Sequence, residues 1–189
     1  FFLIFKTNWS EGNMKIKHRI NTGDAKPIRQ RMRRTPIGFE NEEKQHLNDM
    51  LSAGIIRESS SDWSAAPVLE EKSVEGFVGA LIEGTQQSNK KDAYPLPLKG
   101  ECLDTLAGSK LFLSFDSASG YYQVELEEAD KHKTAFITKY GLYEYNSIPF
   151  GLAGTPATFQ RIMNFVLRGL IWSKALAFLD DTILVRKQF

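Results

Sequence analysis

The sequence predicts an α+β fold, with antiparallel strands and helices in separate parts of the chain. Tyr140-Gly141 divides two β-rich runs and Asp180-Asp181 divides two more, which is the pattern of tight hairpins. Residues 156–168 instead carry apolar side chains at helical spacing. Hairpins combined with such a helix indicate the α+β class.

Two helices have recognisable ends. One is expected over about Asn41–Ala53, with Asn41 as its N-cap. The other is expected over Pro156–Arg168, where proline suits the first helical position. Thr155 is expected to cap this helix and Gly169 to end it.

The other elements are predicted mainly as extended chain, and acidic residues stand where three of these runs end or begin. An acidic hairpin tip taken alone is usually a solvated turn. The extended runs are Tyr94–Pro97, Leu111–Phe115, Thr134–Thr138, Leu142–Tyr145, Ala175–Leu179 and Thr182–Val185, while Tyr121–Leu126 is either extended or a short helix.

Asp116 follows the strand at 111–115, and Asp180 and Asp181 stand at the last hairpin. If these strand ends lie side by side in one sheet, three carboxylates converge, and their mutual repulsion calls for cations between them. Hard oxygen ligands favour Mg²⁺. Two such ions about 3.5–4 Å apart suit an in-line phosphoryl displacement.

Composition excludes several classes of protein. With 42% hydrophobic and 25% charged residues, the 189-residue chain can form one domain or two small subdomains. It has no apolar run near the ~20 residues of a membrane span, and its single cysteine excludes an internal disulfide. The chain does not begin with Met, so we interpret it as an internal piece of a longer protein.

Charge is distributed unevenly along the chain. Residues 1–34 carry nine Lys and Arg against two acidic residues, a net +7, whereas the remainder carries a net −6. The basic stretch is either a solvated tail or an arm that contacts nucleic-acid phosphates. In the second interpretation the contacts are made by Arg29, Arg31, Arg33 and Arg34.

Several short strings occur in a fixed order along residues 18–187. They are His18–Ile28, Lys90–Pro97, Leu103–Gly108, Asp116–Val124, Lys133–Phe136, Pro149–Leu152, Pro156–Gln160 and Phe178–Asp181. Each is weak alone, but their order and spacing together are specific. In these strings the chain resembles the Pol reverse transcriptase of gypsy-like long-terminal-repeat retrotransposons.

The resemblance implies the fingers and palm of a reverse transcriptase, with an antiparallel palm sheet and packed helices, ending before the thumb. Residues 1–34 would be a basic N-terminal extension. The fingers would comprise about 35–91 and 124–155, and the palm about 92–123 and 156–189, incomplete at its C-terminal end.

The resemblance also implies the site residues. Asp116, Asp180 and Asp181 would be catalytic and hold two Mg²⁺ ions, for which Mn²⁺ could substitute. Tyr121 would lie under the sugar and exclude a 2′-hydroxyl, with a core tyrosine as the alternative. The implied nucleotide contacts are Tyr121, Phe150, Gly151 and Lys72, and the implied primer contact is Leu179.

The implied activity is that of an RNA-directed DNA polymerase. Such an enzyme transfers a nucleotide from a deoxynucleoside triphosphate to the 3′-hydroxyl of a primer, on an RNA or DNA template. An intact parent would also carry protease, ribonuclease H and integrase regions. The family is expected inside the cell, in cytoplasmic particles or the nucleus, with no membrane partner.

Residues 70–89 depart from the family pattern. The resemblance implies a basic fingers hairpin here that cradles the triphosphate, but Glu70 and Glu83 stand in this stretch and only Lys72 remains. Codons can be chosen for about residues 74–89 so that a shifted reading frame encodes the residues that the family has there. A frameshift in this segment is therefore one hypothesis. The alternative function is then an inactive relic that at most binds nucleic acid, and the remaining one is a non-enzymatic module with a coincidental acidic hairpin.

Overall fold

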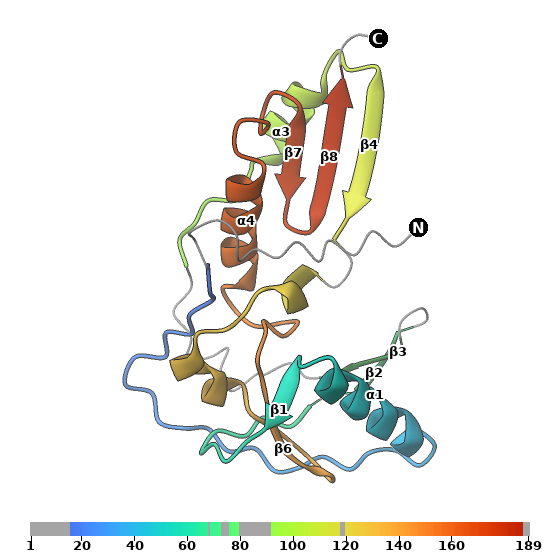
Figure 1. The fold of residues 1–189 in the computed structure, drawn as a ribbon, viewed down its shortest axis with the longest axis vertical. Helices are drawn as coiled ribbons and strands as arrows, with labels where there is room; N and C mark the ends of the chain where they lie inside the picture. Colours follow the sequence, from blue (N-terminus) through green and yellow to red (C-terminus); the bar gives the residue numbers. More distant parts are fainter. Residues whose placement is uncertain (1–15, 68, 73–75, 80–91, 118–119, 187–189) are drawn as a thin grey trace. The chain divides into compact units, whose positions relative to one another are not determined.

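In the computed structural model the chain forms two units, each built from stretches that are far apart in the sequence (Figure 1). Unit 1 includes Asp92–Gly120 and Gly154–Phe189, and unit 2 consists of Lys17–Lys91 and Tyr121–Ala153. The residues that the structure describes are 16–67, 69–72, 76–79, 92–117 and 120–186.

Unit 1 contains a three-stranded antiparallel sheet in the order β4-β8-β7. The strands are β4 (Leu111–Asp116), β7 (Ala175–Phe178) and β8 (Asp181–Arg186), and all three were predicted. The turn between β7 and β8 consists of Leu179 and Asp180. Asp181, which was expected in the turn, instead opens β8.

Helix α4 (Thr155–Val166) packs against β7, and it is the predicted apolar helix. The core of this unit lies between the helix and the sheet; its buried apolar side chains are Ala157, Phe159, Ala175, Leu176, Ala177 and Val185. A further helix, α3 (Lys99–Leu106), was not predicted. It has no buried residue, so no apolar stripe marked it in the sequence.

Both predicted N-caps are wrong. Helix α4 has Gly154 at its N-cap, with φ +88°, and Thr155 is already its first residue. Glycine adopts this left-handed conformation without steric cost, so the chain can enter the helix without a capping side chain. Helix α4 ends at Val166, and Gly169 follows with φ +84°, as a glycine beyond a helix end should.

Helix α1 (Glu40–Ser52) belongs to unit 2 and was predicted within one residue at each end. Its N-cap is Phe39, and Asn41 lies inside the first turn. The buried Thr35 hydroxyl donates to the Glu43 carboxylate at 2.8 Å, which ties the segment before the helix to the helix itself.

The described part of unit 2 also contains two small sheets. One has the order β1-β6-β5, from β1 (Ile56–Glu58), β6 (Gly141–Tyr145) and β5 (Phe136–Thr138), and its β5–β6 hairpin was predicted. The other pairs β2 (Leu69–Lys72) with β3 (Gly76–Gly79). Two 3₁₀ helices, η2 (Gly120–Gln123) and η3 (Glu128–Thr134), follow β4 in the chain.

The basic segment that begins at Lys17 is built into unit 2. Gln30 donates its backbone N–H to the Ser64 carbonyl at 2.8 Å, and Ser64 donates to the Ile28 carbonyl at 2.9 Å. The neighbouring Ala65 donates in turn to Ala135, just before β5. Residues 28–30 therefore extend the sheet edge instead of forming a solvated tail. The predicted boundary at residue 34 and the division into fingers and palm stay predictions.

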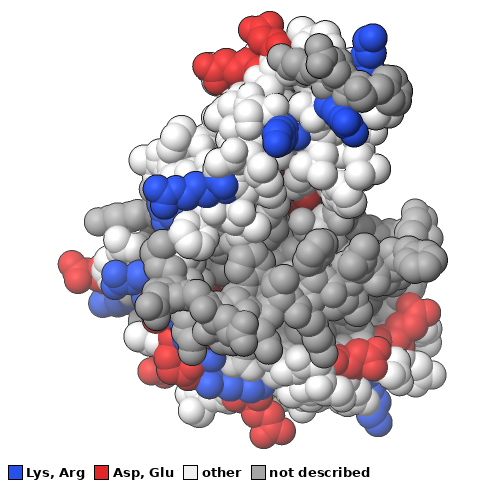
Figure 2. All heavy atoms as spheres, turned by 45° about the horizontal axis from the view of Figure 1, so that its top comes forward, with Lys and Arg blue, Asp and Glu red and all other residues white. Residues whose placement is uncertain are grey.

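The surface of the described residues carries both signs of charge. On the face shown in Figure 2, basic and acidic side chains are interspersed, in keeping with a net charge of +1 for the whole chain. Among the described residues, no helix has the length and apolar character needed to cross a membrane.

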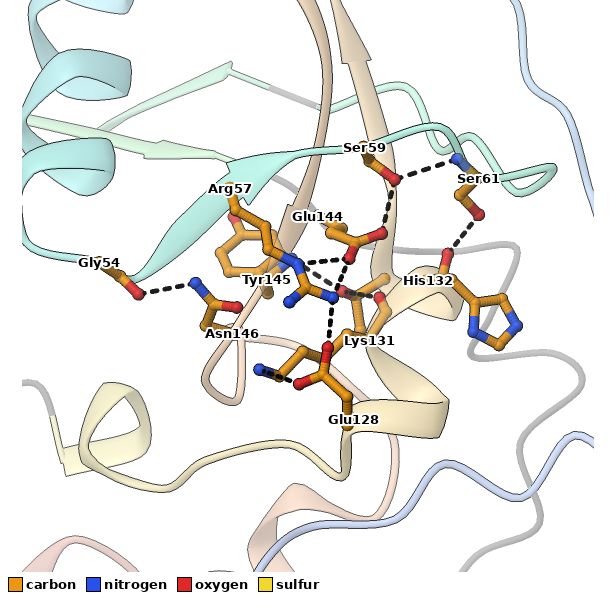
Figure 3. A network of polar contacts seen from close by, with 11 residues as sticks. Gly54, Arg57, Ser59, Ser61, Glu128, Lys131, His132, Glu144, Tyr145 and Asn146 are labelled. Atoms are coloured by element: carbon orange, nitrogen blue, oxygen red, sulfur yellow. Dashed lines mark hydrogen bonds and ion pairs between the residues drawn. The ribbon is translucent and has the colours of Figure 1, made fainter.

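A polar network joins β1, β6 and η3 within unit 2 (Figure 3). The Arg57 guanidinium lies 2.7 Å from the carboxylates of both Glu128 and Glu144. Ser59 donates to the second oxygen of Glu144 at 2.5 Å, and Lys131 lies 2.7 Å from Glu128. The buried Glu144 carboxylate is thus fully partnered, as a buried charge must be.

Candidate functional site

Asp116 and Asp181 are directly opposite each other in the β4–β8 ladder. Residues paired in this way stand about 4.5–5.5 Å apart at Cα. Asp180 is held beside them, because the backbone N–H of Ser117 donates to its carbonyl at 3.1 Å. The strand ends therefore lie side by side, which was the condition for three carboxylates to converge.

The three acidic residues differ in how they are presented. Asp180 is half-buried in the turn and Asp181 is exposed at the start of β8. For Asp116 the structure describes the backbone only. Among the side chains that it does describe, no group of three His, Cys, Asp or Glu is arranged to hold a metal ion. Metal binding by this set stays a prediction.

The turn that carries Asp180 has an unusual backbone. Leu179 adopts φ +56°, in the left-handed region that non-glycine residues rarely occupy. Its N–H donates to the side-chain oxygen of Gln160 on α4 at 2.9 Å. Helix α4 thus reaches the acidic turn directly, a contact that sequence reasoning did not foresee although Gln160 lies within one of the family strings.

Gly120 closes the segment that follows β4. A Cβ at this position would lie 2.8 Å from the Phe159 ring and 2.9 Å from Ser117. Both distances are far shorter than ordinary carbon contacts. Glycine is therefore required here for the chain to pass closely over α4.

Three aromatic rings meet in unit 2. The Phe150 ring lies 5.4 Å from that of Tyr121 and 5.1 Å from that of Tyr122, both in edge-to-face geometry. Such pairs are favourable beyond the area that they bury. Burial raises the pKa of the Tyr122 hydroxyl. Two of the predicted nucleotide contacts, Tyr121 and Phe150, therefore contact each other. A third, Gly151, is exposed and has φ +79°.

Tyr122 was missed by the sequence reasoning. The signal was present in the doublet Tyr121-Tyr122, but a doublet does not reveal which ring contacts which neighbour. The structure shows that Phe150 contacts both. Phe150 therefore contacts the predicted gate Tyr121 and its neighbour Tyr122 together.

The predicted phosphate contacts fall into two groups. Arg29 forms an ion pair with Asp62 and also donates to the Asp62 carbonyl at 3.0 Å, so its charge is already partnered. Arg31, Arg33 and Arg34 are exposed. Lys72 is the last residue of β2, opposite Gly76, and its side chain lies outside the described part of the structure.

Most of the chain matches a known protein family. Residues 69–188 match the family model described as reverse transcriptase (RNA-dependent DNA polymerase). The matched stretch contains all three acidic residues.

This chain belongs to the reverse transcriptase family.

Its relatives include polyproteins of transposons. The chain is 37% identical over 176 residues to the retrovirus-related Pol polyprotein from transposon 297 of Drosophila melanogaster, covering 89% of this chain and 16% of that protein. It is 32% identical over 179 residues to the Pol polyprotein from transposon gypsy of the same organism, covering 91% and 17%. The predicted relationship to the reverse transcriptases of gypsy-like retrotransposons is confirmed. The chain spans only about a sixth of the length of these relatives.

Solved structures confirm the predicted fold. The foamy viral protease–reverse transcriptase in complex with double-stranded DNA superposes with a TM-score of 0.81 at 17% identity, covering 92% of this chain and 30% of that one. The same viral protein in complex with an RNA/DNA hybrid gives 0.80 at 17%, covering 91% and 23%. The α+β reverse transcriptase fold is therefore present, whereas identity this low shows the fold alone.

Proposed function

We propose that this chain is the polymerase part of a retrotransposon Pol protein, which transfers nucleotides from deoxynucleoside triphosphates to the 3′-hydroxyl of a primer. The observation that carries the proposal is the register that places Asp116 opposite Asp181, with Asp180 in the adjoining turn. Family membership supports it. So do the DNA and the RNA/DNA hybrid in the similar viral structures, which make a primer and an RNA or DNA template the proposed partners.

The donor set suits a divalent metal. Two carboxylate residues on paired strands and a third in the adjoining turn offer hard oxygen ligands, and the exposure of Asp181 leaves room for water and phosphate ligands. Asp116, Asp180 and Asp181 would hold two Mg²⁺ ions, or Mn²⁺ in their place. When bound, such ions activate the attacking hydroxyl and stabilise the departing oxygen. The chain's own part is to hold the carboxylates in place, through the β4–β8 ladder and the bond from Ser117 to Asp180.

Tyr121 has a proposed role in selecting the sugar. Its half-buried ring is held edge-to-face by Phe150, so it presents a fixed surface. We expect Tyr121→Ala to raise the use of ribonucleoside triphosphates relative to deoxynucleoside triphosphates. A core tyrosine would instead lower incorporation of both kinds equally. Gly151 and Lys72 are the remaining proposed nucleotide contacts, and Leu179 the proposed primer contact.

Primer extension tests the proposal. The chain is given a primed RNA template, deoxynucleoside triphosphates and Mg²⁺, and variants Asp116→Asn, Asp180→Asn and Asp181→Asn are compared with wild type. Each should lose at least ~100-fold in rate, because a group that stabilises transition-state charge is worth that much. Asp104→Asn, an exposed change on α3, is the matched control and should retain full activity. Wild-type activity in Asp181→Asn would overturn the assignment.

The alternative is a relic that binds nucleic acid without extending it. This hypothesis is favoured by the glutamates on β2, because the family resemblance implies basic residues in that hairpin. It predicts salt-sensitive binding but no incorporation by wild type. Replacing Arg31, Arg33 and Arg34 together by Ala should lower the slope of log affinity against log salt by roughly 1 per arginine. Lys44→Ala, an exposed charge on α1, is the control and should leave the slope unchanged.

A further inference from the structure

The side-chain amide of Gln160 is fully buried and uses every one of its polar atoms. Its oxygen accepts from the backbone N–H of Leu179 at 2.9 Å. Its nitrogen donates to the backbone carbonyl of Ala177 at 2.9 Å and to the side-chain oxygen of Asn164 at 3.0 Å. One side chain on α4 therefore holds the backbone on both sides of Phe178, the residue paired with Asp181.

The orientation of this amide is fixed by its partners. If it were flipped, its NH₂ group would face the N–H of Leu179 and its oxygen would face the carbonyl of Ala177. Donors would then face donors and acceptors would face acceptors around a fully buried side chain, which is costly. Only a group with one acceptor and two donors, held at this length from the helix, satisfies all three partners at once.

The Leu179 bond acts on a strained residue. A non-glycine residue at φ +56° persists only where its surroundings hold it there. The N–H that Gln160 binds belongs to this residue, and the next residue in the turn is Asp180. The contact therefore holds the part of the backbone that sets where Asp180 and Asp181 stand.

Gln160 is held in turn by a chain of polar contacts within unit 1. Asn164, one turn further along α4, donates its NH₂ group to the Tyr94 hydroxyl at 2.8 Å. The Tyr94 ring has the Arg161 guanidinium 4.9 Å from its centre, and Arg161 donates to Asp92 at 2.6 Å. The segment before α3 is thus linked through α4 to the acidic turn.

We propose that Gln160 is a positioning residue for the acidic turn, and that Asn164 and Tyr94 fix its amide from behind. The proposal rests on the proposed function, because the turn matters through the carboxylates that it carries. Gln160 makes no contact with the reacting atoms in this scheme. It acts by holding the turn in the one conformation that presents Asp180 and Asp181 together.

The first test is Gln160→Met, which keeps the volume of the side chain and removes its hydrogen bonds. Two quantities are measured on the full chain: hydrogen exchange at the Leu179 amide, and binding of Mn²⁺ alone by calorimetry. Exchange should accelerate, and Mn²⁺ affinity should fall by roughly 10-fold or more, as is usual when a group that orients metal ligands is lost. Gln45→Met is the control, because Gln45 donates a similar bond on α1, to Asp49.

A second variant keeps the test decisive if Gln160→Met does not fold. Tyr94→Phe removes one hydroxyl and keeps the ring that packs against Arg161. It should change both quantities in the same direction by a smaller factor. Tyr140→Phe is its control, since it removes a hydroxyl that makes a hydrogen bond elsewhere, donating to the Glu40 carbonyl in unit 2.

The outcomes separate this proposal from the proposed function. Wild type that binds no Mn²⁺ and extends no primer defeats the proposed function, while exchange at Leu179 still reports on Gln160. Wild-type exchange and Mn²⁺ affinity in both Gln160→Met and Tyr94→Phe defeat the positioning role. A loss of stability in Gln160→Met with unchanged Mn²⁺ affinity also defeats it, because it shows a contribution to packing alone.

Discussion

Asp116 stands directly opposite Asp181 across two antiparallel strands, at the end of the sheet where the Leu179–Asp180 turn adjoins. Like charges paired across a sheet destabilise it. We therefore expect repulsion between these two residues to lower the free energy of unfolding, and a divalent cation to relieve it. The pairing should then be detectable in stability as well as in activity.

The first prediction follows from that repulsion. In the presence of a chelator, Asp181→Asn should be more stable than wild type, by about 0.2–1 kcal/mol. Added Mg²⁺ should raise the melting temperature of wild type, because a ligand that binds only the folded state stabilises it. The variant should gain less. Thermal unfolding with and without Mg²⁺ measures both effects.

Asp104→Asn on α3 provides the comparison. It removes the same charge outside the acidic strand ends and should respond to Mg²⁺ as wild type does. A less stable Asp181→Asn in chelator, or equal Mg²⁺ shifts in all three proteins, would mean that Asp116 and Asp181 do not repel each other in the folded chain.

The second prediction concerns the backbone of Leu179. Glycine adopts a positive φ without strain, whereas alanine does not. Leu179→Gly should therefore be at least as stable as Leu179→Ala, and more stable by about 1 kcal/mol if the strain is fully released. Leu179→Val should be the least stable of the three, because β-branched residues tolerate this conformation worst. Urea unfolding gives the order.

A helix supplies the matched comparison for glycine against alanine. Ala157→Gly in α4 should cost about 1 kcal/mol, since glycine is unfavourable inside a helix. The sign of the alanine-to-glycine effect is thus expected to reverse between positions 157 and 179. The same sign at both positions would show that the backbone of Leu179 is not strained in solution.

The sequence predicted the strands of this fold better than the details that build the site. Alternating and continuous apolar runs mark β4, β7 and β8. The apolar side chains of β7 are largely buried, whereas those of β4 are exposed. The turn was misplaced by one residue. A polar Asp180-Asp181 pair suggests a turn by composition, whereas the actual turn begins with an apolar leucine held at positive φ.

The helix N-caps and the contacts that support the turn could not be predicted from the sequence, for a related reason. Thr155 has the chemistry of a cap, but Gly154 enters the helix in a left-handed conformation and displaces it by one position. In the sequence, Gln160 looks like an ordinary polar residue on an amphipathic helix. Its role depends on partners at positions 177 and 179, which only the tertiary fold brings to it.

The third prediction concerns the close approach at Gly120. Gly120→Ala should destabilise the chain by about 1–3 kcal/mol, the usual cost of overpacking, because its methyl group would overlap the Phe159 ring. Phe159→Leu removes the tip of that ring. The double variant should therefore lose less stability than the two single variants together, and a double-mutant cycle from urea unfolding measures the difference. Strict additivity would contradict the contact.

The last prediction concerns pH and the network around Glu128. Hydrogen bonds from Lys131 and Arg57 lower the pKa of the Glu128 carboxyl from 4.5 to about 2. A carboxyl with a lowered pKa in the folded state stabilises the fold above its unfolded pKa. That stabilisation is lost as the pH falls from 4.5 towards 2.

Glu128→Gln should accordingly be less stable than wild type near neutral pH, with the difference shrinking below pH 4.5 and vanishing near the pKa of about 2. Because Glu128 is exposed, the difference should also shrink at high salt. Urea unfolding across this pH range measures it, with Glu42→Gln, an exposed change on α1 outside the network, as the comparison. A pH-independent difference would mean that the Glu128 side chain acts by packing, since an ion pair with Arg57 and Lys131 must disappear when the carboxyl is protonated.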